Sequence, residues 1–371
     1  FYSEAQGISL TLDHGKDVDQ ETNVLETLKK GVFKQQENEG NDDKSAPSKL
    51  RYLQTVRIIN AGVLLQSENF AEDVILKNTR IVMKKNDAQV TATLDGTMHI
   101  RENTTPVLGH IYFNPDAKTN IASLHFSDLE ITDLTTLISE NWRKRMMVEG
   151  VFNGTSHFSF DSAFQPQNVR LEVNVKNGRF NFDNVFAAPV SFDTLGLVSS
   201  YNFLTRDLEF EDVRLTRDEL SLKMTGASQI SDDAKTVDIK LDSTLENLPT
   251  NDIALYWPQD VIPAARDWVA NNIKNGLVTS AHQKLHITRH ENNNKDHFDI
   301  HALDGEIHFD KANVTYLKDF PSVENVSGNA LFDQQRFVIN LDKGVYNKTE
   351  LKPSKITIEG FEDTPHIAIN L

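Results

Sequence analysis

The chain has 371 residues, and its 38 Lys and Arg against 54 Asp and Glu give a formal net charge of −16. That balance excludes a nucleic-acid coat, which needs a basic surface. The chain contains no cysteine, which excludes disulfides, Cys-ligated zinc and thiol nucleophiles. Hydrophobic residues make up 39% of the chain, yet no window approaches the roughly 18 apolar residues of a membrane-spanning helix.

Residues 1–48 are predicted to form a separate N-terminal segment. Phe1 to Gly7 lack the basic and apolar regions of a signal peptide. Apolar residues at helical spacing predict a short amphipathic helix over 21–34, and the polar run 35–48 is typical of a flexible linker. Because no leader is recognisable and the strand pattern at 366–371 has no closing turn, we expect the chain to be a fragment of a longer protein.

From about residue 50 onward, apolar and polar residues alternate with a period of two, which predicts β-strands with one dry and one wet face. The clearest strand covers 89–101. The segment 169–182 contains Asn177-Gly178, a pair typical of tight turns, so a β-hairpin is predicted there. The apolar members of these segments are the candidate lining of a groove: Val90, Ala92, Leu94, Met98, Ile100, Val169, Leu171, Val173, Val175, Phe180, Phe182, Leu220, Leu222, Met224, Val237, Ile239, Leu241, Phe298, Ile300, Phe337, Ile339 and Leu341.

Alternation on so many strands is typical of antiparallel sheet, since parallel strands covered by helices on both faces would be apolar throughout. The sequence therefore predicts a mainly β protein with a few short helices, and not a Rossmann or α/β barrel fold. Two arrangements satisfy the pattern. Two sheets can bury each other's apolar faces in a sandwich, or one long curved sheet can line a groove with its apolar face. Periodicity alone favours the sandwich.

Two further helices are predicted, over 132–142 and 263–275. The second has the clearer boundaries, with Pro263 at its first position and Gly276 just after its end. Its apolar stripe is made of Trp268, Val269 and Ile273. Ordinary packing of this stripe on a sheet is the simplest interpretation.

Twelve histidines raise the question of a metal site, and His282, His286 and His290 are evenly spaced. On a strand, residues four apart lie roughly 13 Å from each other, too far to share an ion whose bonds are near 2.1 Å. His297 and His301 alternate with apolar residues and are expected on a polar face too. The sequence therefore predicts no metal site and no cofactor.

Catalytic motifs are equally absent from the sequence. It contains no nucleophile elbow, no phosphate-cradling glycine loop, no His-Glu-x-x-His helix and no EF-hand loop. Carboxylates are plentiful, but the sequence singles out no pair of them as an acid and a base. We therefore expect that the protein is not an enzyme.

The segment 256–276 carries a recognisable motif: Tyr256-Trp257-Pro258, then Pro263, Ala265-Arg266, Trp268-Val269, Asn272-Ile273 and Gly276. It resembles a motif of the AsmA-like family, YhdP type. Downstream, a phrase that looks like that family's recurring strand pattern is formed by Val323-Glu324-Asn325-Val326-Ser327-Gly328, Ala330 and Phe332. The likeness spans roughly residues 50–371, and its Trp-Pro motif is more specific than its strands.

The resemblance implies a periplasmic protein, tethered to the inner membrane by an N-terminal helix that this sequence lacks. Its elongated, curved and twisted antiparallel β-sheet would form a groove that conducts phospholipids toward the outer membrane. The implied partners are phospholipid acyl chains, and both membranes through segments missing here, but no nucleic acid. A second hypothesis is a structural or assembly scaffold for outer-membrane biogenesis that conducts no lipid.

On this basis we predict four regions. They are the N-terminal segment 1–48, a β-groove region 49–250, the Trp-Pro motif with a capping helix at 251–276, and a continuing β-groove region 277–371. In this picture Trp257, Trp268, Val269 and Ile273 belong to the capping helix and its approach. Alternation by itself does not separate apolar residues that line a groove from those of a closed core.

Overall fold

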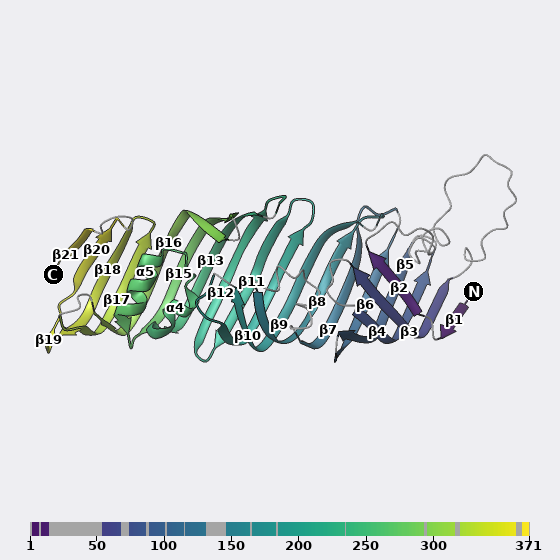
Figure 1. Cartoon of the computed structure of the whole chain (residues 1–371), viewed down its shortest axis with the longest axis horizontal. Coiled ribbons are helices and arrows are strands. Elements are labelled where there is room, and N and C mark those ends of the chain that lie inside the picture. Colours follow the sequence, from purple (N-terminus) through teal and green to yellow (C-terminus); the bar gives the residue numbers. More distant parts are fainter. Residues whose placement is uncertain are drawn as a thin grey trace. The chain divides into compact units, whose positions relative to one another are not determined.

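The structure is a computed structural model that describes most of the chain beyond residue 53 and two short N-terminal strands (Figure 1). The described residues are 2–6, 9–14, 54–67, 74–86, 89–100, 102–114, 116–130, 146–163, 165–182, 185–233, 235–292, 295–315, 320–360 and 366–370. The helices predicted at 21–34 and 132–142, and the predicted linker 35–48, lie outside them. In the described part, no helix has the length and apolar content needed to cross a membrane.

Antiparallel strands dominate the described residues, which confirms the predicted fold class. The chain divides into two compact units, which are residues 1–144 with 151–173, and residues 145–150 with 174–371. Unit 1 contains β1 (Tyr2–Gln6), β2 (Ser9–His14), β3 (Thr55–Ser67), β4 (Val74–Lys85), β5 (Val90–Ile100), β6 (Asn103–Phe113), β7 (Asn120–Glu130), most of β8 (Met146–Phe160) and the start of β9 (Pro166–Phe182). From β3 to β8 each strand pairs antiparallel with the next, while β1 and β2 pair parallel with β3.

Unit 2 contains a ladder of the same kind. It contains β10 (Val190–Asn202), β11 (Asp207–Arg217), β12 (Leu220–Ile230), β13 (Thr236–Pro249), the 3₁₀ turn η2 (Thr250–Asp252), α4 (Ile253–Tyr256), α5 (Pro263–Asn272), β14 (Ile273–Lys274), β15 (Leu277–Asn292), β16 (Lys295–Val314), β17 (Val323–Asp333), β18 (Arg336–Tyr346), β19 (Thr349–Glu350), β20 (Ser354–Glu359) and β21 (His366–Asn370). Strands β10 to β13, β15 to β18, β20 and β21 pair in that order, always antiparallel. No pairing among the described strands closes this ladder on itself.

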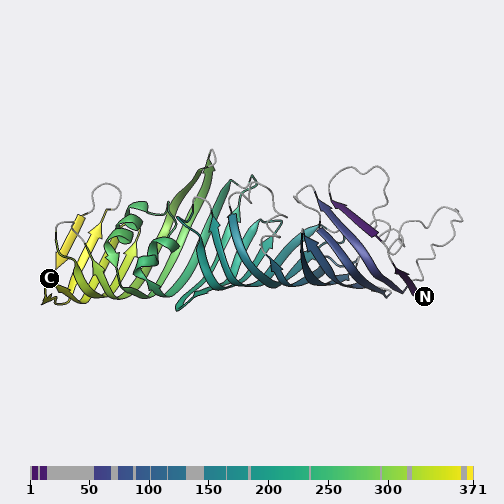
Figure 2. The ribbon, with the colours of Figure 1, turned by 60° about the horizontal axis from the view of Figure 1, so that its bottom comes forward.

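The sheet of unit 2 is one layer thick and bent into a trough (Figure 2). No second sheet packs on it among the described residues, so the sandwich that periodicity alone favours is wrong. Alternation reports only that one face is apolar, and it carries no information about what lies opposite that face.

Left-handed residues inside the strands provide the bend. Seven non-glycine residues within strands have φ between 50° and 57°: Asn60, Asn78, Asp128, Asn177, Asn247, Lys311 and Asn325. The pairing register shifts at Asn60, Asn78, Asp128, Lys311 and Asn325, as a β-bulge requires. A bulge bends its strand and increases the local twist, and Asn and Asp adopt this conformation more readily than most residues.

The residue after a bulge is repeatedly a core residue. Ala61 and Val326 are 1% exposed, and Thr79 is 0% exposed. The same holds after Asp128 and Lys311, where Leu129 and Ala312 are buried. A buried residue therefore follows each of the five bulges.

The predicted hairpin at Asn177-Gly178 is wrong, because the left-handed asparagine lies inside a continuous strand and not in a turn. β9 runs without a turn from Pro166 to Phe182, and Asn177 lies inside it with a left-handed φ of 50°. Gly178 is needed because a Cβ there would lie 2.3 Å from the Phe192 ring. The left-handed Asn177 lies between the odd apolar positions that end at Val175 and the even apolar positions that begin at Phe180.

We predict that Asn325→Val lowers the free energy of unfolding by about 1–2 kcal/mol, because a β-branched residue must then adopt a left-handed conformation. Urea unfolding followed by circular dichroism measures the change. Asn325→Gly is the matched control and should remain close to wild type, since glycine adopts this conformation at no steric cost. Equal stability of the two variants would contradict the role assigned to the bulge.

Candidate functional site: the apolar face of the sheet

Apolar side chains form a continuous row across the sheet of unit 2. Direct register partners on successive strands are Leu195, Leu215, Leu222, Leu245, Ala281, Ile307, Ala330, Ile339 and Ile356. We call the side of the sheet that carries them the groove face. With strands about 4.8 Å apart, eight steps make a row of about 38 Å. The row crosses the strands, so it runs along the trough.

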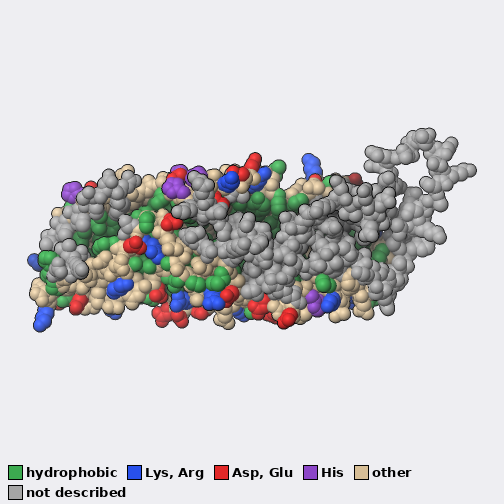
Figure 3. All heavy atoms as spheres, viewed as in Figure 1, with side chains coloured by type: hydrophobic (Ala, Val, Ile, Leu, Met, Phe, Trp, Pro, Cys, Tyr) green, Lys and Arg blue, Asp and Glu red, His purple; other side chains and the backbone are tan. Residues whose placement is uncertain are grey.

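Most members of this row are only partly covered. Leu215 and Ala330 are buried, at 3% and 2% exposed, but Leu195, Leu222, Leu245, Ala281, Ile307, Ile339 and Ile356 are half-buried. In Figure 3, hydrophobic side chains gather in the hollow of unit 2, with charged side chains and histidines along its borders. The groove face is thus an apolar surface with polar margins.

Unit 1 has an apolar face of the same kind. Ile111 and Phe158 are both register partners of Ala122, so the three side chains lie on one side of the sheet. Ile111 is 45% exposed and Phe158 is 40% exposed. Large apolar side chains left this open on one face mark a surface that can receive an apolar ligand.

The predicted lining residues separate into two groups by burial. Val90, Met98, Ile100, Val173, Val175 and Leu220 are at most 9% exposed and therefore belong to the packed core. The half-buried group is Ala92, Leu94, Val169, Leu171, Phe180, Leu222, Met224, Val237, Ile239, Leu241, Phe298, Ile300, Phe337, Ile339 and Leu341, and Phe182 is 37% exposed. Only this second group offers surface to a ligand.

Sequence reasoning missed several members of the groove face. Leu195, Leu215, Leu245, Ile307 and Ile356 complete the apolar row. Each of them alternates with polar neighbours, but less regularly than the segments singled out from the sequence. Their alignment comes from strand register, which pairs residues far apart in the chain.

Residues 250–276 form an insertion between two neighbouring strands, which we call the strap. β13 and β15 are register partners up to Pro249 and Leu277, so the strap begins and ends at neighbouring positions, and near its end β14 pairs with β16. Its neck is closed by the Thr250 amide, which donates to Gly276 O at 3.0 Å, and by the Gly276 amide, which donates to Thr250 Oγ1 at 2.9 Å. A Cβ at Gly276 would lie 2.5 Å from the Ala312 Cα, so the neck requires glycine.

The strap extends over the groove face. Figures 1 and 2 place α4 and α5 over strands of the trough. At its far end the Gln259 amide donates to Val185 O at 2.8 Å, in the connection between β9 and β10. Arg217, on the groove face of β11, donates to Tyr256 Oη at 3.4 Å, and this hydrogen bond raises the pKa of Arg217 above its usual value. The strap therefore reaches from β15 back past β11.

Arg266 holds the strap together. Its side chain is 12% exposed, and its guanidinium donates to Ala254 O at 3.0 Å and to Trp257 O at 3.2 Å. The Trp257 indole in turn donates to Val261 O at 2.6 Å. These bonds fix the loop between the two helices to the helices themselves.

The predicted helix 263–275 is found at 263–272, three residues shorter than expected. Ile273 has extended backbone and belongs to β14, where it pairs with Val314 of β16. Its placement in the capping helix is therefore wrong. Its β-branched side chain fits a strand, and the end of β16 supplies the partner. Trp257 precedes the helix, and within it Trp268 is 38% exposed and Val269 is half-buried.

The histidines of β15 lie on the opposite, polar face. His282 and His286 each pair with an Asp of β13, and His290 pairs with Asp299 of β16. They are spread along the strand as predicted and do not meet one another. His301 of β16 does approach His286, which reasoning along a single strand could not detect.

We predict that Arg266→Ala loosens the strap, because two backbone carbonyls lose a charged donor, each such bond being worth about 1.5–3 kcal/mol. Hydrogen exchange measured by mass spectrometry should become faster in peptides covering 253–272 and stay unchanged in β12. Arg214→Ala is the control, since Arg214 pairs with Asp212 on the exposed polar face. Equal protection of the strap in both variants would refute the role of Arg266.

Comparison with known proteins gives a single family. The model of the family described as YhdP protein matches residues 132–371, which is more than half of the chain. No curated protein and no solved structure gives a significant match.

Proposed function

The chain belongs to the YhdP family, and from this premise we propose that it is an envelope lipid-transfer protein whose groove face shields phospholipid acyl chains between the inner and outer membranes. The proposed location is the periplasm, and the proposed partners are phospholipids and the two membranes. No chemical step is part of the proposal, so the protein acts by binding and not as an enzyme.

The observation that carries the proposal is the uninterrupted apolar row of the groove face. Moving one methylene from water to an apolar surface is worth about 0.8 kcal/mol, so an acyl chain of about fifteen carbons resists exposure by on the order of 12 kcal/mol. Along the row from Leu195 to Ile356, every member except the buried Leu215 and Ala330 offers partly exposed apolar surface. A chain moving along such a row exchanges one apolar contact for the next and is never transferred wholly to water.

The borders of the groove face suit the other end of a phospholipid. Polar and charged side chains occupy both margins of the hollow in unit 2 (Figure 3), so a headgroup can remain hydrated while its chains lie on the apolar floor. An open sheet also admits a ligand from the side. A closed sandwich would offer neither feature.

We predict that Leu222→Glu reduces co-purifying phospholipid at least tenfold, because an ionised carboxylate placed among apolar side chains is costly for a lipid tail to cover. The matched control is Lys223→Glu, which introduces the same residue one position along β12 on the opposite, exposed side. Native mass spectrometry of the purified protein, with lipid extraction, gives the occupancy. Thermal unfolding of both variants establishes that they are folded.

Two results would contradict the proposal. One is a wild-type protein that carries no lipid and melts cooperatively, which would favour the structural scaffold for outer-membrane biogenesis. The other is equal lipid loss in Leu222→Glu and Lys223→Glu, which would place the lipid elsewhere than on the groove face.

A further inference from the structure

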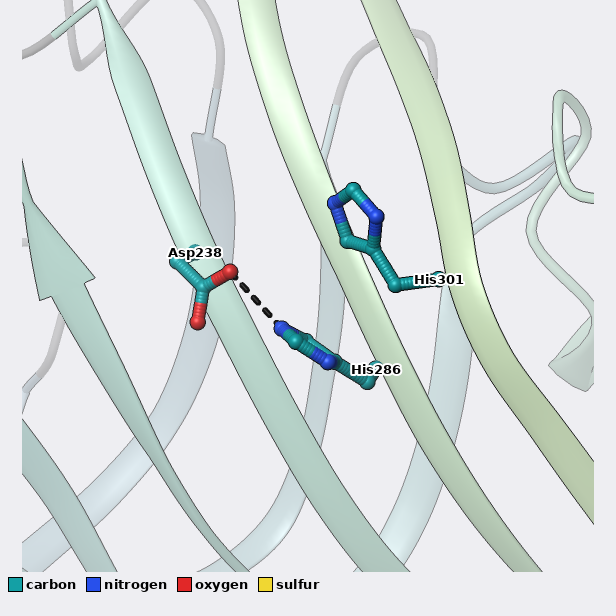
Figure 4. A group of neighbouring side chains, drawn as sticks. All are labelled: Asp238, His286 and His301. Atoms are coloured by element: carbon teal, nitrogen blue, oxygen red, sulfur yellow. Dashed lines mark hydrogen bonds and ion pairs between the residues drawn. The ribbon is translucent and has the colours of Figure 1, made fainter.

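Three potential metal ligands from three neighbouring strands meet on the polar face of unit 2. They are Asp238 of β13, His286 of β15 and His301 of β16, whose ligand atoms all lie within 4.8 Å of one another. Figure 4 shows the three side chains converging from their separate strands. The groove face lies on the other side of the sheet, so this cluster is separate from the proposed lipid surface.

An irregularity in β16 brings His301 into the cluster. Ile287 pairs with Ile300 and His286 pairs with Ala302, which leaves His301 as the extra residue of a bulge. In a regular strand the side chains of His301 and Ala302 would point to opposite sides of the sheet, so His301 could not share the side of Ala302 and its partner His286. Bulges often re-aim a side chain where function requires it, and here the re-aimed ring lies 4.8 Å from the His286 ring, centroid to centroid.

Hydrogen bonds already link the groups that would hold an ion. Nε2 of His286 lies 2.8 Å from Asp238 Oδ2. The Thr288 hydroxyl lies 2.6 Å from Nε2 of His301 and donates to Asp238 Oδ2 at 3.3 Å. The two imidazole rings, the carboxylate oxygen and the hydroxyl are thus directed toward the same small space.

The donor set has the chemistry of a transition-metal site. Two imidazole nitrogens and one carboxylate oxygen suit Zn²⁺ and its neighbours, with bonds of about 2.0–2.2 Å. Asp238 and His286 are half-buried and His301 is exposed, so water can reach the site and complete a tetrahedral shell. Small side-chain rotations draw the three donors onto one ion.

We propose that Asp238, His286 and His301 bind one divalent transition-metal ion, Zn²⁺ foremost. The ion ties β13, β15 and β16 together at the border of the trough where β13 begins and β15 ends. Because it binds the folded sheet and not the unfolded chain, it raises the stability of this border in proportion to its occupancy.

The test is isothermal titration of the purified chain, freed of any affinity tag and of metal by chelator, with zinc chloride at pH 7.5. We expect one equivalent bound, and a Co²⁺ complex whose visible absorption indicates nitrogen ligands. His301→Gln should weaken zinc binding by more than tenfold and abolish the rise in thermal midpoint that zinc gives the wild type. Asp238→Asn should act in the same direction.

The matched control is His282→Gln. His282 lies on the same strand and face, with Nε2 2.8 Å from Asp242 Oδ1, but it is not among the three clustered ligands. Zinc affinity in this variant should equal that of the wild type. The proposal is overturned if His301→Gln and His282→Gln bind zinc equally. It is also overturned if the site is lost only in His290→Gln, which would assign the ion to the neighbouring pair of His290 and His297 on Asp299.

Discussion

A sheet that is one layer thick has an apolar face that no second sheet covers. The rest of this structure depends on how that face is partly shielded from water. The strands bend at left-handed residues such as Asn247, Lys311 and Asn325, and the residues that follow them are buried. The sheet thus contains closely packed residues at its bends although no second sheet covers it. The bend also turns the remaining apolar side chains toward one another across a hollow, where they are half-covered and still accessible.

Curvature and strand register together align the repeated apolar side chains into one row along the trough. Successive strands contribute apolar side chains to the groove face, and antiparallel pairing aligns one from each into the row from Leu195 to Ile356. No individual residue is indispensable to such a surface, in contrast to an active site. Its useful property is continuity, because a flexible apolar chain can contact any part of it.

The strap and the histidine cluster use the two sides of this sheet differently. The strap occupies the groove side, fixed at a narrow neck by Thr250 and Gly276 and at its far end by Gln259. The cluster of Asp238, His286 and His301 occupies the polar side at the opposite ends of β13 and β15. A single layer has two accessible faces, so the proposed lipid surface and the proposed metal site use the same strands without competing for space.

The sequence by itself determined that the protein is mainly antiparallel β, because a period of two survives in any strand whose faces differ in polarity. It also identified the strand 89–101, the helix beginning at Pro263 and the family motif around Trp257. It misread Asn177-Gly178, because asparagine and glycine adopt a left-handed backbone both in a turn and inside a bent strand.

Only the tertiary structure decided whether the apolar face is closed or open, which side chains share a row, and that His301 reaches His286. Each of these depends on pairing between strands that are distant in the chain. One extra residue in β16 is enough to change such a pairing, and a bulge of that kind leaves no reliable mark on local sequence. Local periodicity specifies a strand's faces, whereas register and curvature arise from contacts along the whole sheet.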